Sequence, residues 1–183
     1  MSYKQNSLQG DSALVEIYRD LGVETAFKDN SITLLKLNHQ TLSINQQLNN
    51  TPDIAQTIAV TCFGLGIGCH LTGLHTLKIK ETDRLEALKT ELQKFGADIS
   101  VTNDSLTLMA HTLFQDLSAA GTLPSGREEA VSVATYNDHR MAMAFAPLAL
   151  KTPIVIKDAG VVSKSYPTFW DDMQALGFVI NKQ

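Results

Sequence analysis

The chain is 183 residues long, which is enough for one domain or two very small ones. Hydrophobic residues make up 44% of the sequence and charged residues 19%, a balance that predicts a globular protein rather than a disordered tail. The formal net charge of −4 argues against a general nucleic-acid-binding surface and against binding to anionic membranes. No apolar run reaches the roughly eighteen residues of a transmembrane helix, and the polar start predicts no signal peptide.

The first predicted elements are an amphipathic helix and a β-hairpin, over residues 12–35. Apolar side chains recur every three or four positions from Leu14 to Leu21, as on the buried face of a surface helix. Gly22 then supplies the left-handed conformation that commonly ends a helix. Two strand patterns follow, joined at Asp29-Asn30, which is a typical hairpin turn sequence.

A helix that is apolar on nearly all sides is predicted next, over residues 53–63, and it should lie in the interior. The glycines within residues 64–68 predict a turn after this helix, because they lack the spacing of a dinucleotide-binding loop. The β-rich residues 74–80 are expected to form the following strand. Cys62 and Cys69 have no CxxC spacing, so we expect two buried free thiols in a reducing, cytoplasmic protein.

The helix-and-hairpin pattern occurs again over residues 82–109. Its helix has an apolar face from Leu85 to Phe95, and Gly96 stands at the position that ends it. Two strand patterns follow, joined by a turn at residues 103–104. Residues 125–129 are polar and predict an exposed loop.

The last third of the sequence begins the same series once more. Residues 139–150 predict a second helix that is apolar all round, and residues 152–158 predict the strand after it. A third copy of the helix-and-hairpin pattern starts with a helix over 169–176. Gly177 and a strand over 178–180 follow it.

Together these segments describe a repeating unit of buried helix, strand, polar loop, amphipathic helix and two-stranded hairpin. Two such units account for nearly the whole sequence. They predict the α/β class (α+β) and a single globular domain over residues 1–183, built by duplication. Because the chain opens with the second half of a unit, we expect it to be part of a longer protein.

Ionisable and polar residues cluster at four equivalent points of the repeat, where helices are predicted to begin. These clusters are residues 51–53, 80–84, 136–140 and 160–164. Helix N-termini attract anions because their first N–H groups have no partner within the helix and because the helix dipole is positive there.

Four cations belong to these clusters: Lys80, Arg84, Arg140 and Lys164. If the helix ends converge, they would form a strong oxyanion site, with the arginines gripping a carboxylate or phosphate through paired bonds. The histidines form no i,i+4 pair, and no GxSxG motif is present, so neither a zinc site nor a serine nucleophile is predicted.

Each polar cluster also has a simpler structural interpretation. Asp53 and Asp138 could act only as helix caps or as favourable charges for the dipole. Thr82 could be the N-cap of its helix, and residues 80–84 could form a solvated salt-bridge cluster. His139 could be a partly buried, hydrogen-bonded histidine.

Five ordered motifs give the sequence a specific resemblance. KETDRL (80–85) and YNDHRMAM (136–143) carry it, together with NSLQGD (6–11), TPDIAQTIAV (51–60) and SKSYPTFWDDM (163–173). They resemble the C-terminal part of the enolpyruvylshikimate-phosphate synthases, also called 3-phosphoshikimate 1-carboxyvinyltransferases. The resemblance implies the enolpyruvyl transferase fold, in which two domains each contain three βαβαββ units. The chain would hold about two of those six units and would lack the N-terminal domain.

The resemblance also implies a reaction of aromatic amino-acid biosynthesis, the shikimate pathway. The family transfers the enolpyruvyl group of phosphoenolpyruvate to the 5-hydroxyl of shikimate 3-phosphate and releases phosphate. It implies no metal or organic cofactor and a monomeric, cytoplasmic parent enzyme. The implied partners are the two substrates and the absent N-terminal domain, with no nucleic acid and no membrane.

Catalytic and phosphoenolpyruvate-binding residues are implied by the same resemblance. Asp53 falls on the proton acceptor, and Glu81 falls on the acid near the phosphoenolpyruvate methylene. Arg84, Arg140 and Lys164 fall on the cationic clamp around phosphoenolpyruvate. The proton of the methylene carbon could be handled by either Glu81 or Lys164.

The remaining implied residues bind shikimate 3-phosphate or support the site. Lys80 falls on a contact to shikimate 3-phosphate, Thr76 on a substrate-side position, and Asp53 contacts the shikimate hydroxyls. Asp138 and His139 fall on supporting positions. Because the family forms its active site between two domains, the isolated chain is expected to be inactive.

Two other functions stay open at this point. The first is the related enolpyruvyl transferase that acts on UDP-N-acetylglucosamine, although the motifs at 80–85 and 136–143 favour the shikimate enzyme. The second is a non-catalytic module that binds small anions through Arg84, Arg140 and Lys164 and has only a structural or receptor role.

Overall fold

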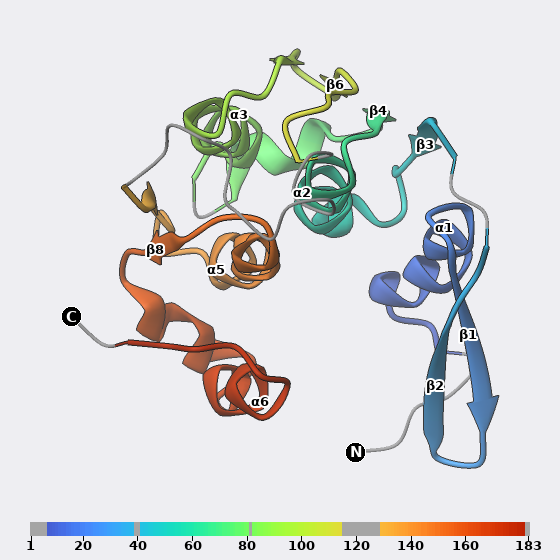
Figure 1. Ribbon diagram of the computed structural model, residues 1–183. Helices are drawn as coiled ribbons and strands as arrows, with labels where there is room; N and C mark the ends of the chain where they lie inside the picture. Colours follow the sequence, from blue (N-terminus) through green and yellow to red (C-terminus); the bar gives the residue numbers. More distant parts are fainter. Residues whose placement is uncertain (1–6, 39–40, 81, 115–128, 182–183) are drawn as a thin grey trace.

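The computed structural model describes residues 7–38, 41–80, 82–114 and 129–181 (Figure 1). The α-helices are α1 (Leu14–Asp20), α2 (Ala55–Leu65), α3 (Arg84–Lys94), α5 (His139–Phe145) and α6 (Phe169–Ala175). Within these ranges lie also the 3-10 helices η1 (Gly10–Ala13), η2 (Pro52–Ile54), η3 (His75–Ile79), η4 (Ala146–Leu150) and η5 (Ala159–Lys164).

The strands form three small sheets. They are β1 (Val23–Lys28), β2 (Ser31–Lys36), β3 (Ser43–Gln47), β4 (Gly68–Thr72), β5 (Ile99–Val101), β6 (Ser105–Leu108), β7 (Val131–Val133) and β8 (Ile154–Ile156). β1 and β2 form an antiparallel hairpin, and β7 pairs with β8 in parallel. The third sheet has the order β3-β4-β6-β5, with β3 parallel to β4 and the other neighbours antiparallel. This mixed architecture confirms the predicted fold class.

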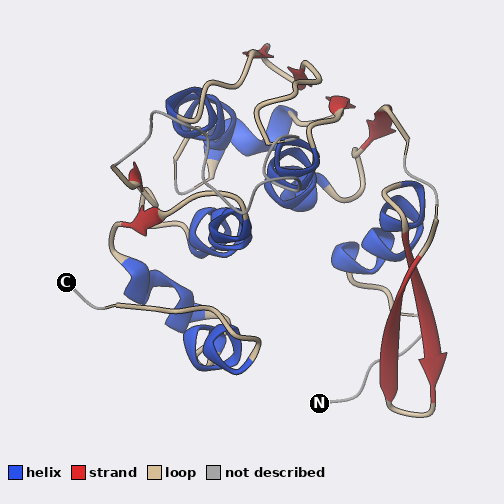
Figure 2. Ribbon diagram, in the orientation of Figure 1, coloured by secondary structure: helices blue, strands red, loops and turns tan. Residues whose placement is uncertain are grey.

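Helices α2 and α5 lie side by side in the middle of the molecule, as the two all-round apolar segments predict (Figure 1). Figure 2 shows the strands placed around the outside of these helices. Pro52 begins the first turn before α2, where its missing N–H costs nothing. The second buried segment changes from α-helix to 3-10 helix at Ala146, next to Pro147, because proline cannot donate the next i→i−4 bond.

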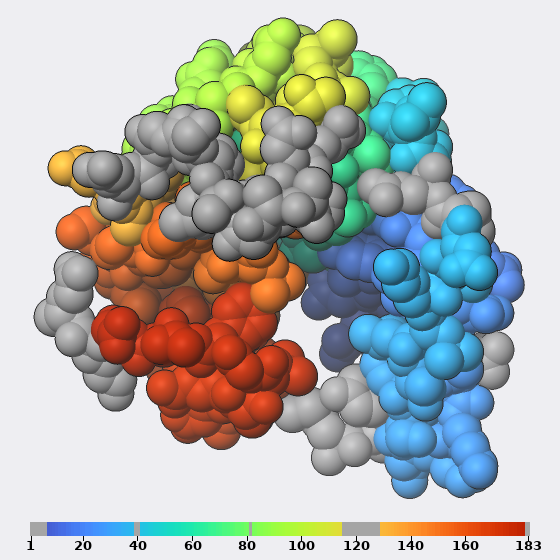
Figure 3. All heavy atoms as spheres, in the orientation of Figure 1, coloured from blue at the N-terminus to red at the C-terminus, as the bar shows by residue number. Residues whose placement is uncertain are grey.

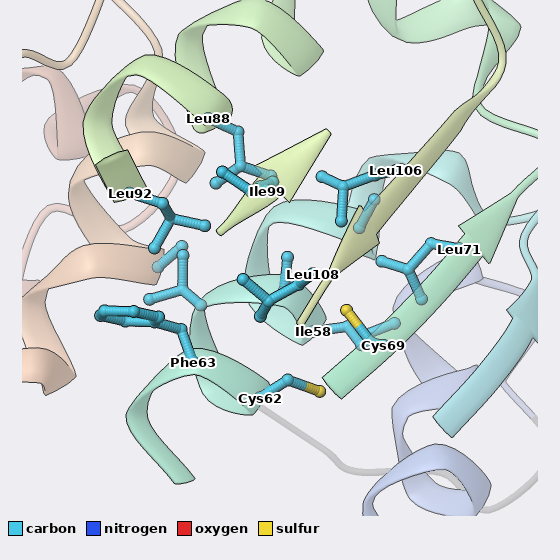
Figure 4. Close-up of a cluster of buried hydrophobic side chains, with 14 of the residues drawn as sticks. Ile58, Cys62, Phe63, Cys69, Leu71, Leu88, Leu92, Ile99, Leu106 and Leu108 are labelled. Atoms are coloured by element: carbon cyan, nitrogen blue, oxygen red, sulfur yellow. The ribbon is translucent and has the colours of Figure 1, made fainter. Parts of the chain in front are cut away.

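The main hydrophobic core lies between α2, α3, α5 and the four-stranded sheet (Figure 4). Its largest fully buried side chains include Phe63, Phe95 and Phe145. The rings of Phe63 and Phe95 are in edge-to-face contact, with their centroids 6.1 Å apart. Each such side chain contributes about 1.5–3 kcal/mol by leaving water. A second core cluster joins α5 to Val162 in η5 and to Phe169 in α6.

The predicted helix-and-hairpin copies are confirmed in the first two cases. Gly22 and Gly96 both have positive φ, at 88° and 92°, directly after α1 and α3. In the third copy Gly177 also ends its helix, with φ 97°. The predicted strand over 178–180 is wrong, because these residues pair with no part of the chain that the structure describes, and a strand exists only with a hydrogen-bonded neighbour.

The strand predicted over residues 74–80 is also wrong. The strand is β4, at residues 68–72, in the region expected to be a turn, and residues 75–79 form η3. Leu74 and Leu77 are both buried, so the burial has a period of three, which suits a 3-10 helix rather than a strand. Strands β3 and β7 had no sequence prediction.

Both cysteines are buried and unbonded, as expected. Cys62 lies on α2 and Cys69 on β4 (Figure 4). A hydrogen bond with Cys69, and then burial, raises the pKa of the Cys62 thiol above its usual range, so it stays a neutral thiol. Within the described ranges no helix is long and apolar enough to cross a membrane.

Alanine substitutions at two glycines with positive φ distinguish the cost of a left-handed backbone from the cost of a steric clash. Gly66, which ends α2, has φ 76°, and a Cβ there would lie 2.7 Å from the His111 carbonyl oxygen; Gly177 has a similar φ with nothing within 4 Å. We expect Gly177→Ala to lower the free energy of unfolding by about 1–2 kcal/mol, which is the cost of left-handed backbone. Gly66→Ala should lower the free energy of unfolding by about 3 kcal/mol, because the clash with the His111 carbonyl oxygen adds to the cost of the left-handed backbone. Urea denaturation measures both.

Gly160→Ala is the matched control for these variants, because a Cβ at Gly160 meets nothing within 4 Å and needs no positive φ. It should change the free energy of unfolding by less than about 0.5 kcal/mol. Equal losses for Gly66→Ala and Gly177→Ala would contradict the predicted clash with His111.

His111 makes folding stability depend on pH. Its Nε2 is 2.9 Å from the Phe63 carbonyl oxygen, its Nδ1 accepts a hydrogen bond from the Leu113 N–H, and burial lowers the pKa of the ring. Protonation of Nδ1 removes that acceptor. Because the folded-state pKa lies below the unfolded value of about 6.5, the stabilisation is complete above that value and is lost as pH falls through the folded-state pKa.

We therefore expect the free energy of unfolding to fall between pH 7 and pH 5, more steeply in the native chain than in His111→Gln. Denaturation in urea at several pH values measures this. His75→Gln, at an exposed position, is the control and should keep the native pH dependence. An identical dependence in the native chain and His111→Gln would show that another group is responsible.

Candidate functional site

Three of the predicted helix starts meet at one point. Arg84, the first residue of α3, contacts two carboxylates: its Nη1 lies 2.9 Å from Asp53 Oδ1, and its Nε lies 2.7 Å from Asp138 Oδ2. Asp53 precedes α2 in the chain and Asp138 is the N-cap of α5. The Arg84 and Asp138 side chains are 3% and 0% exposed, whereas Asp53 is 37% exposed. This buried charge cluster is the centre of the candidate site.

Asp53 is surrounded by positive charge. Besides Arg84, Lys80 Nζ lies 3.4 Å from Asp53 Oδ1. The Nη1 of Arg140 donates a hydrogen bond of 3.2 Å to the Asp53 backbone carbonyl and also lies 3.4 Å from Asp11 Oδ1. Three of the four predicted cations thus contact Asp53, two of them at its partly exposed carboxylate and Arg140 at its backbone carbonyl.

Lys164, the fourth cation, is joined to the same cluster through Asn137. Its Nζ donates hydrogen bonds of 3.1 Å to the Asn137 backbone carbonyl and 2.9 Å to Asn137 Oδ1. Asn137 directly precedes Asp138, so Lys164 lies next to the start of α5. The predicted convergence of four cationic segments is therefore present, with Lys164 at the end of η5 rather than at the start of α6.

Asp138 serves both as a helix cap and as an ion-pair partner. Its Oδ1 accepts a hydrogen bond of 2.9 Å from the Arg140 backbone N–H, which satisfies one free donor of α5. Its Oδ2 faces Arg84 and also accepts a hydrogen bond of 3.2 Å from Gln56 Nε2. His139 Nδ1 lies 4.0 Å from Asp138 Oδ1, which places this ring at the edge of the cluster.

Several of the simpler interpretations are corrected by these contacts. Asp53 is not the N-cap of η2, because Thr51 holds that position and Asp53 lies within the first turn. The N-cap of α3 is Asp83 and not Thr82: Asp83 Oδ1 accepts hydrogen bonds from the backbone N–H groups of Leu85 and Glu86. Arg84 is not part of a solvated salt-bridge cluster, because its side chain is buried.

Two predicted site residues need separate mention. The Thr76 hydroxyl is buried and has no hydrogen-bond partner among the residues that the structure describes. Glu81, the predicted acid, lies outside the described residues. No group of three or more histidine, cysteine, aspartate or glutamate residues that could hold a metal ion occurs in the described part of the chain.

Three further residues contribute to the cluster without having been singled out from the sequence: Asp11, Gln56 and Asn137. Each lies inside one of the motifs that carry the family resemblance, at 6–11, 51–60 and 136–143. Their motif membership was the only available signal. Their contacts depend on residues that lie 129, 82 and 27 positions away in the sequence.

The backbone beside the cluster is in a rare conformation. Tyr136 and Asn137 have φ values of 54° and 58°, so two successive non-glycine residues are left-handed. Burial and a hydrogen bond to Glu91 raise the pKa of Tyr136 to about 12, which keeps its hydroxyl protonated. Four cations and three carboxylates, of which Asp53 and Asp11 are accessible and Asp138 is buried, form a site that can bind an anionic ligand and accept a proton from it.

Comparison with known proteins identifies the family of the chain. The family described as EPSP synthase (3-phosphoshikimate 1-carboxyvinyltransferase) matches residues 2–173. The chain belongs to the EPSP synthase family. This membership confirms the resemblance carried by the five motifs and favours it over the UDP-N-acetylglucosamine transferases.

Individual relatives extend the match over nearly the whole chain. The 3-phosphoshikimate 1-carboxyvinyltransferase of Bacteroides fragilis is 42% identical over 177 residues, which are 96% of this chain and 40% of the relative. That of Haemophilus influenzae is 31% identical over 174 residues, 94% of this chain and 37% of the relative. The chain thus spans about 40% of the length of the curated relatives it matches.

Solved structures share the fold. The EPSP synthase of Acinetobacter baumannii matches with a TM-score of 0.59 and 22% sequence identity, covering 94% of this chain and 40% of that one. At this identity the match shows the fold alone, and it agrees with the mixed α/β architecture described above.

The ion pair between Arg84 and Asp138 makes Asp138→Asn a sharp test of the site. Asparagine keeps the capping oxygen of α5 but removes the charge that faces the buried guanidinium. We expect the free energy of unfolding to fall by about 3 kcal/mol, the low end for breaking a buried pair, because Asp53 still contacts Arg84. Urea denaturation measures the loss.

Asp11→Asn is the matched control. Its carboxylate is 55% exposed and lies 3.4 Å from Arg140, so the loss should stay below about 1 kcal/mol. A similar loss in the two variants would contradict the claim that Arg84 depends on Asp138 for its buried charge.

Proposed function

We propose that the chain supplies one half of the active site of a 3-phosphoshikimate 1-carboxyvinyltransferase. The enzyme would transfer the enolpyruvyl group of phosphoenolpyruvate to the 5-hydroxyl of shikimate 3-phosphate and release phosphate, as a cytoplasmic step of aromatic amino-acid biosynthesis. The observation that carries the proposal is the convergence of Arg84, Lys80 and Arg140 on Asp53, with Lys164 next to Asp138. Family membership supports the reaction class.

Asp53 is the proposed proton acceptor. A base must take the proton of the attacking hydroxyl, and it must be reachable by the substrate. Asp53 is 37% exposed, whereas Asp138 is fully buried, so Asp53 is the carboxylate of this pair that a substrate hydroxyl can reach. Arg84 and Lys80 hold its Oδ1 in position.

Arg140 and Lys164 are the proposed outer cations of the phosphoenolpyruvate site. Their bonds in this structure go to backbone carbonyls, to an amide oxygen and to the exposed Asp11, which a carboxylate or phosphate could replace. Arg84 completes the clamp from its buried position and links it to Asp53. The side chains supply the positive charge that the departing phosphate requires, so the proposed chemistry needs no metal or organic cofactor.

The remaining assignments follow the family resemblance. Lys80 and Thr76 would contact shikimate 3-phosphate. The buried Thr76 hydroxyl has no hydrogen-bond partner among the described residues, which supports a contact that a ligand completes. Glu81 would protonate the methylene carbon, with Lys164 as the other candidate for that proton. Asp138 and His139 would support the clamp.

The other half of the site would come from an N-terminal part of the enzyme, with residues 1–183 forming part of one of its two domains. The coverage of about 40% of the relatives' length supports this division. The described segments leave a hollow between the α1–β2 segment and α6 (Figure 3). The whole enzyme is proposed to act as a monomer.

Phosphate release tests this proposal. The chain is incubated with phosphoenolpyruvate and shikimate 3-phosphate, alone and together with the N-terminal part of the Bacteroides fragilis relative that this chain does not match. We expect turnover only in the mixture. Asp53→Ala and Glu81→Ala should each lower it by about 10²–10⁴-fold, because each removes a group that moves a proton.

Asp98→Ala, at an exposed position outside the site, is the control and should leave the rate unchanged. Equal turnover by the chain alone would contradict the half-site. A folded mixture that binds phosphoenolpyruvate but releases no phosphate, with or without Asp53, would instead indicate a non-catalytic anion-binding module.

A further inference from the structure

Glu91 is a fully buried carboxylate that the proposed reaction does not use. It lies on α3 with 0% of its side chain exposed. Its Oε1 accepts a hydrogen bond of 2.8 Å from the Tyr136 hydroxyl, and its Oε2 accepts one of 3.1 Å from the Ala134 backbone N–H. Lys94 Nζ also contacts Oε2 and donates a hydrogen bond of 3.1 Å to the Ser132 carbonyl. Burying a carboxylate charge costs free energy, and the partners of Glu91 only offset that cost. Its location therefore calls for a reason.

Apart from the contact between Lys94 and Glu91, which lies within α3, these contacts go to the segment that leads into α5. Ser132 lies in β7, Ala134 directly follows that strand, and Tyr136 begins the left-handed turn that includes Asn137. Left-handed conformations at non-glycine residues cost about 1–3 kcal/mol each and persist only where surrounding contacts hold them. Glu91 supplies such contacts on both sides of Thr135, at Ala134 and at Tyr136.

The direction of the Tyr136 bond is also defined. Burial, and then the hydrogen bond to Glu91, raise the pKa of Tyr136 to about 12, so the phenol is protonated at neutral pH and donates to the carboxylate. The turn is therefore held by a phenol that remains a hydrogen-bond donor at neutral pH.

Three residues of the candidate site depend on the geometry of this turn. Asp138 directly follows it and caps α5, and Arg140 donates its backbone N–H to that cap. Lys164 donates to both oxygens of Asn137, whose φ is 58°. A turn that relaxed to ordinary backbone dihedrals would redirect the Asn137 oxygens and move the start of α5.

α3 holds this segment at two points. Arg84 and Glu91 are seven residues apart, which is two helical turns or about 10.5 Å along one face. Arg84 contacts Asp138 at the start of α5, and Glu91 contacts the residues just before it. The two contacts together set both the position and the orientation of the segment relative to α3.

We propose that Glu91 is a positioning residue of the site: its buried carboxylate holds the Tyr136–Asn137 turn in its left-handed conformation and thereby places Asp138, Arg140 and Lys164. The consequence for phosphoenolpyruvate binding rests on the proposed function, whereas the placement of Lys164 does not.

Two variants test the placement in the chain itself. Glu91→Gln keeps the size of the side chain but removes its charge. The amide oxygen can still accept from the Ala134 N–H and Lys94, whereas the NH₂ group then faces the Tyr136 hydroxyl, so the bond from that hydroxyl to a charged acceptor is lost. Tyr136→Phe removes the hydroxyl and leaves the carboxylate in place. Loss of one bond to a charged acceptor should raise the local opening of the turn by about tenfold.

The measurements are amide hydrogen exchange over residues 134–140 and the rate of acetylation of Lys164, with the exposed Lys157 as internal reference. We expect both variants to speed exchange in this segment and to raise the acetylation of Lys164 relative to Lys157. Glu86→Gln is the control, since this exposed acid on the same helix pairs only with Lys89 among the contacts described. It should change neither measurement.

A purely structural role for Glu91 would give a different result. Gly66→Ala destabilises the fold at a distance from the turn, so it should speed exchange throughout the core without singling out residues 134–140 or Lys164. If Glu91→Gln and Tyr136→Phe behave like Gly66→Ala, or like Glu86→Gln, the positioning role is wrong.

The kinetic consequence is measured in the two-part phosphate-release assay. We expect Glu91→Gln to raise KM for phosphoenolpyruvate by about tenfold, with a smaller change in kcat, because Arg140 and Lys164 would be displaced while Asp53 would not. An unchanged KM in an active mixture would overturn the link to substrate binding. An inactive native mixture would count against the proposed transferase, while exchange and acetylation would still decide the role of Glu91.

Discussion

The Arg84 guanidinium joins the beginnings of three helices, because it starts α3 and contacts Asp53 ahead of α2 and Asp138 at the cap of α5. Removing these charges from water costs several kcal/mol per ion, and the attraction between them recovers that cost only in good geometry. Gln56 and the Arg140 backbone N–H contribute further hydrogen bonds to Asp138. The cluster therefore serves less as a source of stability than as a constraint on how the three helices meet.

Duplication explains why so many charged groups lie in one place. Each unit directs a buried helix and an amphipathic helix toward the centre, and the two buried helices α2 and α5 lie side by side there (Figure 1). Equivalent loops of the two units are therefore brought together. The same property makes the cluster an attractive place for an anionic substrate, since several helix N-termini and several cationic side chains act on one small volume.

The charged side chains of the site differ in how far they are exposed to solvent. Arg84 and Asp138 are buried and hold each other, Asp53 is accessible on one side, and Lys164 is reached through Asn137 at the surface. The buried pair can keep its geometry while the outer cations exchange their protein partners for a ligand. Glu91 extends this rigid inner layer along α3 to the left-handed turn from which the outer groups project.

The sequence by itself determined those features that depend on nearby residues. Apolar spacing located the amphipathic and buried helices, glycines such as Gly22 and Gly96 located their ends, and the turn at Asp29-Asn30 located a hairpin, since each needs only a few consecutive residues. The five motifs identified the family and most of the charged residues that converge.

Only the tertiary structure decided the rest. Strands β3 and β7 exist because β4 and β8 lie beside them, and Glu91 becomes a site-positioning residue only because Tyr136, 45 positions away, folds against it. Strand pairing and buried ion pairs join residues distant in the chain, and no local pattern encodes such contacts.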